Sequence, residues 1–163
     1  MTDLRRLTVI ALASSIAGCA SLREGPDQIC KELARFANAT PAGQVRSVEL
    51  VNDWGSRFAE NKSSIFTKDC SHNGYPPGVA FCDYLMSNTS TEFSSINYAR
   101  VSACLWPGTR GGPYDTDIDY LSIKASSTEA IGVNPDVRVG VEFSTGSDKA
   151  APTLKMYAER EAE

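Results

Sequence analysis

The sequence has one histidine, His72, among 163 residues. A catalytic Ser/His/Asp triad or Cys/His pair would therefore have to use this residue. It stands in a run of turn-forming residues, Cys70-Ser71-His72-Asn73-Gly74, and no nucleophile-elbow pattern accompanies it. We interpret His72 as a surface loop residue and expect no catalytic set. A hydrolase that uses His72 is the alternative.

Positive charge and long apolar runs are also scarce. The chain has 16 Lys and Arg against 20 Asp and Glu. A nucleic-acid-binding domain needs a basic face, and electrostatic binding to anionic lipid needs clustered Lys and Arg. The excess of acidic residues argues against both functions. No stretch after residue 18 approaches the roughly 20 apolar residues that cross a bilayer. The glycine-rich stretch Gly108–Pro113 lacks the P-loop lysine and the Rossmann spacing, so we interpret it as a surface loop.

The acidic residues do not form a recognisable cation site. Asp115, Asp117 and Asp119 alternate as at the start of a calcium-binding loop. However, Tyr120 stands where that loop needs glycine, and Ser126 stands where it needs glutamate. We interpret the three aspartates as the solvent-facing side of a strand, and we expect neither a metal nor a cofactor.

The first 22 residues have the pattern of an export signal. Arg5 and Arg6 precede a short apolar run, Leu7–Gly18, which ends in small residues at Cys19. A positive start, an apolar stretch of about a dozen residues and small residues before a cleavage site are typical of a secretory signal peptide. The run is shorter than the roughly 20 residues of a membrane-spanning helix.

The end of this run, Ile16-Ala17-Gly18-Cys19, resembles the lipobox of bacterial lipoproteins. The resemblance covers only the signal segment, and an ordinary signal peptide with a chance cysteine is the alternative. It implies that residues 1–18 are removed and that Cys19 carries diacylglycerol, usually with an acylated amino terminus. Because Ala20 and Ser21 follow instead of aspartate, it also implies the periplasmic face of the outer membrane. Residues 19–26 would form a short tether.

Cleavage before Cys19 removes two arginines and one aspartate, which leaves 145 residues with 14 basic and 19 acidic side chains and a net charge of −5. This length is enough for one domain with a hydrophobic core. The remaining cysteines are Cys30, Cys70, Cys82 and Cys104. An even number in an exported chain predicts two disulfides, with three possible connectivities. A zinc site of Cys70, His72, Cys82 and Cys104 is the alternative, which would leave Cys30 unpaired.

We expect Cys70 to pair with Cys104, which leaves Cys30 with Cys82. The expectation assumes that the helices on either side of Asn88 form an antiparallel pair. At ~1.5 Å per residue, Cys82 and Cys104 would then be offset by roughly 14 Å along the helices. A disulfide tolerates Cα separations of only about 4.4–6.8 Å.

Three stretches have helical periodicity. Asp27 is a suitable N-cap for a helix that extends to Asn38, because apolar residues recur there at helical spacing. A second helix is expected from about Val79 to Met86. A third is expected after Thr89-Ser90-Thr91-Glu92, which has the spacing of a capping box, and it reaches Cys104.

Four stretches predict strands. Val45–Val51 is rich in β-branched residues, and Asp117–Lys124 begins a last third with period-two patterning. Residues 137–144 alternate between apolar and polar, and residues 154–158 do so after a turn, which predicts a hairpin. The fold class is therefore α+β: one domain over 27–163 with an antiparallel sheet of about four strands and two or three helices packed on one face.

The function suggested by these features is that of a tethered protein-binding module, such as an inhibitor, an immunity protein or an accessory subunit of an envelope system. Trp106, Arg110 and Tyr114 are the candidate anchors, because these residue types are enriched at binding hot spots and lie in a break between elements. The alternative for Trp106 and Tyr114 is a structural role, with Trp106 packed in the core. A structural envelope lipoprotein is a further alternative for the whole chain.

Overall fold

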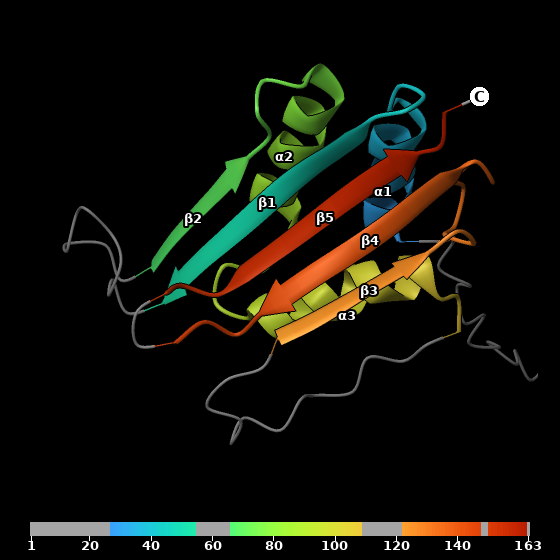
Figure 1. Cartoon of the computed structure of the whole chain (residues 1–163). Coiled ribbons are helices and arrows are strands. Elements are labelled where there is room, and N and C mark those ends of the chain that lie inside the picture. Colours follow the sequence, from blue (N-terminus) through green and yellow to red (C-terminus); the bar gives the residue numbers. More distant parts are fainter. Residues whose placement is uncertain (1–26, 55–65, 109–121, 148–149, 163) are drawn as a thin grey trace, which may run out of the picture.

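A computed structural model of the chain describes residues 27–54, 66–108, 122–147 and 150–162. These residues form three helices and five strands (Figure 1). The helices are α1 (Gln28–Asn38), α2 (Pro76–Asn88) and α3 (Ser94–Leu105). The strands are β1 (Val45–Trp54), β2 (Phe66–Ser71), β3 (Ser122–Ser127), β4 (Val137–Ser144) and β5 (Thr153–Arg160). The expected signal peptide and tether lie outside the described residues.

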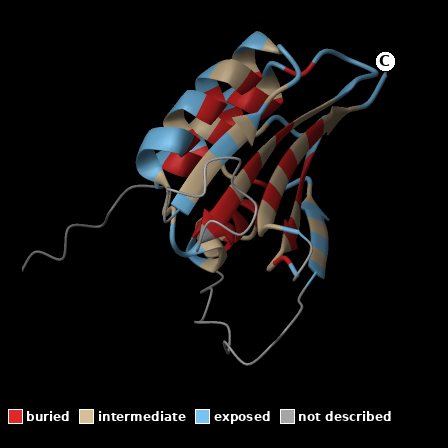
Figure 2. Ribbon diagram, turned by 90° about the vertical axis from the view of Figure 1, so that its left-hand side faces the viewer, coloured by how far each residue is buried: buried red, intermediate tan, exposed pale blue. Residues whose placement is uncertain are grey.

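The strands make one antiparallel sheet in the order β2-β1-β5-β4-β3, with all three helices on one of its faces (Figure 1). The α+β class and the two disulfides are therefore confirmed, with one strand more than expected. Buried residues gather between the helices and the sheet (Figure 2). The sheet joins segments from both ends of the domain, because β1 pairs with the last strand, β5.

The expected hairpin is present as β4 and β5. The apolar residues that alternate in its sequence are the residues that are buried. Alternate residues of β4, such as Val141 and Phe143, are buried against the helices. They lie opposite Met156 and Leu154 of β5, which are also buried. The period-two pattern fixes this register, because a slip by one residue would turn every apolar side chain toward water.

The opposite face of the sheet is polar and carries a row of alternating charges. Glu142 of β4 lies between Lys124 of β3 and Lys155 of β5, with nitrogen–oxygen distances of 2.6 Å and 3.7 Å. The hydrogen bond from Lys124 lowers the pKa of Glu142 below its ordinary value. On the same face the ring of Tyr157 lies over Gly140, so close that a Cβ atom there would be 2.0 Å from its Cζ atom.

The expected disulfide pairing is wrong. Cys30 is bonded to Cys104, with a Cα–Cα distance of 5.2 Å, and Cys70 to Cys82, at 5.6 Å. The expectation failed because it paired α2 with α3 as a hairpin, whereas α1 packs beside both of them. The first turn of α1 therefore meets the last turn of α3. Cys70 near the end of β2 is bonded to Cys82 in the middle of α2, which follows β2 after a short turn.

Two local expectations also need correction. The four residues Thr89–Glu92 do not cap α3, which begins at Ser94 after Phe93. Thr89 instead ends α2, where its hydroxyl donates to the Leu85 carbonyl at 2.6 Å. Strand β2 was not expected, because it is a short edge strand that is mostly polar and has no apolar alternation. Of the expected strand 117–124, only residues 122–124 lie in the described part of the chain.

Candidate functional site

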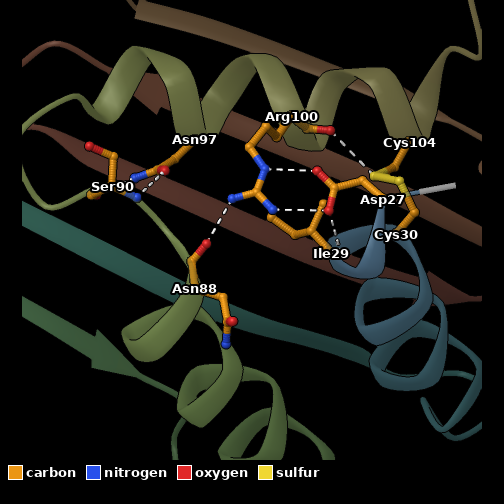
Figure 3. Close-up of polar contacts among 8 residues, drawn as sticks. All are labelled: Asp27, Ile29, Cys30, Asn88, Ser90, Asn97, Arg100 and Cys104. Atoms are coloured by element: carbon orange, nitrogen blue, oxygen red, sulfur yellow. Dashed lines mark hydrogen bonds and ion pairs between the residues drawn. A yellow bond between two sulfur atoms is a disulfide. The ribbon is translucent and has the colours of Figure 1, made fainter. Parts of the chain in front are cut away.

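The junction where the preceding chain joins the domain is built around an ion pair between Asp27 and Arg100. Arg100 Nε donates to Asp27 Oδ2 at 2.8 Å, and Arg100 Nη2 donates to Asp27 Oδ1 at 2.9 Å (Figure 3). A bidentate arrangement of this kind fixes direction as well as distance, because both partners are planar. It ties the first described residue to the middle of α3, 73 positions away in the sequence.

Asp27 also performs the capping role expected from the sequence. Its Oδ1 atom accepts a hydrogen bond from the Ile29 backbone N–H at 3.3 Å. The hydrogen bond from Arg100 is the largest cause that holds the pKa of Asp27 below its ordinary value of 3.8. The same bond raises the pKa of Arg100. One carboxylate therefore stabilises the start of α1 and joins that start to α3.

Arg100 and Lys68 both bind the carboxyl end of α2. Arg100 Nη1 donates to the Asn88 carbonyl at 2.8 Å (Figure 3). Lys68 Nζ, on β2, donates to the carbonyls of Met86 and Thr89, each at 2.8 Å. The last carbonyls of a helix lack intrahelical partners and carry partial negative charge, so cations stabilise them. Burial lowers the pKa of Lys68.

The disulfide Cys30–Cys104 lies beside this ion pair and joins the same two helices (Figure 3). Both cysteines are buried. The start of α1 is therefore held to α3 by one covalent bond and by a bidentate ion pair. Both links oppose fraying of the first turn of α1.

The loop between α2 and α3 is held by buried amides. Asn97 Oδ1 accepts from the Ser90 N–H at 2.8 Å, and Asn97 Nδ2 donates to the Ser90 carbonyl at 2.7 Å (Figure 3). Asn52 of β1 donates to the same carbonyl and to that of Thr91. The loop thus has partners in both the helix layer and the sheet, which fixes the direction in which α3 leaves α2.

The three candidate anchors are only partly placed by the structure. Trp106 is the C-cap residue of α3, and its backbone N–H donates to the Ser102 carbonyl at 3.0 Å. Its side chain is half-buried and packs against the core, as the structural alternative anticipated. Arg110 and Tyr114 lie outside the described residues, so their role stays a prediction.

His72 lies in the turn between β2 and α2. Its Nδ1 atom accepts a hydrogen bond from the Gly74 backbone N–H at 3.2 Å. Because Cys70 and Cys82 form a disulfide and Cys104 pairs with Cys30, none of these cysteines is left as a thiolate for the zinc alternative. Across the described ranges, no cluster of three His, Cys, Asp or Glu residues is arranged to hold a metal ion.

No local pattern in the sequence marked Arg100 or Lys68 as residues that hold the helix ends. Arg100 stood within the expected third helix, but nothing local linked it to Asp27. Lys68 belongs to the strand that was not expected. The one feature of this junction that the sequence indicated was Asp27 as the N-cap of the first helix.

Comparisons with known proteins add no assignment. No protein-family model, no curated protein and no solved structure matches the chain. In the part of the chain that the structure describes, no helix has the length and apolar character needed to cross a membrane.

Proposed function

We propose that the protein is a lipid-anchored envelope protein that is held through Cys19 at the periplasmic face of the outer membrane and binds another envelope protein. The observation that carries the proposal is the lipobox Ile16–Cys19 at the end of the apolar run Leu7–Gly18. Two disulfides support export, because such bonds persist mainly in oxidising compartments.

The junction at Asp27 supports a tethered arrangement. Cys19 precedes Asp27 by eight residues, so a fully extended tether reaches about 28 Å. A lipid anchor on so short a tether keeps the domain close to its membrane. The ion pair with Arg100 and the neighbouring disulfide hold the start of the domain in place at the tether's end.

The proposed binding role rests on the rigid scaffold of the domain and on the residues that follow α3 in the sequence. A binding domain needs a rigid scaffold and a few anchor residues, and two disulfides and a five-stranded sheet among the described residues supply such a scaffold. Trp106 packs against the core and precedes Arg110 by four positions and Tyr114 by eight. These two side chains are the contacts to test first.

The test is capture of a partner from periplasmic extract by the unlipidated domain, produced from residue 20 onward without the signal segment and Cys19. We expect specific capture that weakens in the Arg110→Ala and Tyr114→Ala variants without a fall in melting temperature. Arg35→Ala is the matched control, because Arg35 lies exposed on α1 and its loss should leave capture unchanged.

The same experiment separates the alternatives. If His72→Ala abolished the biological effect while folding and capture were intact, a hydrolase that uses His72 would replace the proposal. If the wild-type domain captured no specific partner, the structural-lipoprotein alternative would replace the binding role.

A further inference from the structure

The outward side of α3 lacks the charges that a solvent-facing helix normally carries. Its sequence, Ser-Ser-Ile-Asn-Tyr-Ala-Arg-Val-Ser-Ala-Cys-Leu, contains one charged residue, Arg100. Asn97, Tyr98, Val101, Ser102, Cys104 and Leu105 are the residues that it buries. The helical repeat leaves Ile96, Ala99 and Ala103 together on the side away from the core. Ile96 is 49% exposed, and Phe93, immediately before the helix, is 51% exposed.

The charge of Arg100 is already matched within the protein. Asp27 binds its guanidinium group through two hydrogen bonds, and the Asn88 carbonyl accepts a third. A surface that carries an unpaired charge resists contact with hydrocarbon, because removing the charge from water is costly. Arg100 is the one charged residue within α3, so the outward side of the helix carries no such charge; Glu92, which precedes Phe93, is exposed and charged. Helix α1 differs, because Lys31 and Arg35 lie exposed along it.

The tether ends at Asp27, which caps α1 and is joined to α3 by its ion pair with Arg100. Asp27 is bonded to Arg100, and Ile96 precedes Arg100 by four positions, so the two side chains are neighbours on α3. Twelve helical residues are about 18 Å long. The eight-residue span from Cys19 reaches about 28 Å at most. All of α3 therefore lies within reach of a bilayer that holds Cys19.

We propose that the outward side of α3, formed by Phe93, Ile96, Ala99 and Ala103, rests on the bilayer that holds the lipid anchor. The inference rests on the proposed lipidation of Cys19. The acyl chains supply attachment, and the tether raises the effective concentration of α3 at the lipid surface. A few half-exposed apolar side chains then suffice to orient the domain. The helix layer faces lipid through α3, and the charged face of the sheet turns toward the periplasm.

The test places a fluorescent label at position 96 in the mature lipidated protein, by Ile96→Cys, and reconstitutes the protein in phospholipid vesicles that contain nitroxide-labelled acyl chains. Lys31→Cys and Ser126→Cys are the controls. Lys31 lies one turn after Asp27 and is exposed, so it reports proximity to the tether alone. Ser126 lies exposed on β3, opposite Gly140, on the polar face of the sheet.

We expect the label at position 96 to lose most of its emission to the nitroxide lipids, while the labels at positions 31 and 126 keep theirs. Equal emission from all three labels on vesicle-bound protein would overturn the inference and leave the lipid anchor standing. Emission at position 96 that changes with protein density but not with nitroxide lipid would assign this side of α3 to a second copy. Failure of the unlabelled protein to sediment with vesicles would overturn the lipid anchor, and this inference with it.

Discussion

Removing the disulfide Cys30–Cys104 should destabilise the domain more than removing Cys70–Cys82. The two bonds close loops of very different length, with sequence separations of 74 and 12 residues. A disulfide stabilises a fold mainly by restricting the unfolded chain, and the restriction grows with the logarithm of the loop length. The loop-entropy relation gives about 4.4 kcal/mol for the longer loop and about 2.8 kcal/mol for the shorter one at 25 °C.

The predicted difference is therefore about 1.6 kcal/mol, or roughly 3–6 °C in melting temperature for a domain of this size. Packing acts in the same direction. Cys30 and Cys104 are both buried, whereas Cys70 is only half-buried. Cavity formation in the alanine variants should thus add to the difference and not reduce it.

The assay is urea unfolding of two double variants, Cys30→Ala/Cys104→Ala and Cys70→Ala/Cys82→Ala, each made in the unlipidated domain that begins at residue 20. The pairing that the sequence suggested would close loops of 52 and 34 residues. The same relation gives those two bonds nearly equal stabilisation, about 4.1 and 3.8 kcal/mol. Equal losses of stability, or a larger loss without Cys70 and Cys82, would refute the reasoning. Non-reducing peptide mapping that gave a Cys30–Cys82 peptide would refute it directly.

Two further predictions concern Asp27 and Gly140. Asp27→Asn keeps an N-cap side chain but loses the ion pair, and since the Asp27 side chain is 41% exposed the loss in unfolding free energy is small, about 0.5–1 kcal/mol at pH 7. Arg100 holds the pKa of Asp27 below 3.8 in the folded state, so this stabilisation is present above pH 3.8 and disappears as the pH falls through the lowered pKa. The unfolding free energies of wild type and variant should therefore converge in acid. A difference that stays constant with pH would contradict the ion pair as its source. Gly140→Ala should lower the unfolding free energy by about 1 kcal/mol, because the new methyl group displaces the Tyr157 ring. In a Tyr157→Ala background the same substitution should be neutral or stabilising by about 0.5–1 kcal/mol, because glycine within a strand costs more conformational entropy on folding than alanine. A loss of equal size in both backgrounds, measured by chemical unfolding, would exclude the ring as the cause.

The features that were predictable from the sequence are those encoded by local patterns. Asp27 as a cap and the helix that follows it needed only neighbouring residues, and so did the alternation in β4 and β5. These patterns give helices and strands of a definite type, from which the α+β class follows.

The features that were not predictable depend on how those elements pack. Whether Cys30 meets Cys82 or Cys104 depends on which helix lies beside α1, and no local pattern carries that information. Strand β2 forms because β1 offers it an edge, since its own residues are largely polar and exposed. The bond between Asp27 and Arg100 joins positions 73 apart and arises only after α1 and α3 have packed.

The lipid on Cys19 is the central claim, and mass spectrometry of the amino-terminal peptide from envelope-purified protein tests it most directly. The account predicts a peptide that begins at Cys19 and carries a diacylglyceryl group on its sulfur, usually with an acyl chain on its amino group. The Cys19→Ala variant should persist as an unprocessed precursor. An unmodified Cys19 thiol, or a mature chain that begins at another residue and is recovered in the soluble periplasmic fraction, would contradict the claim.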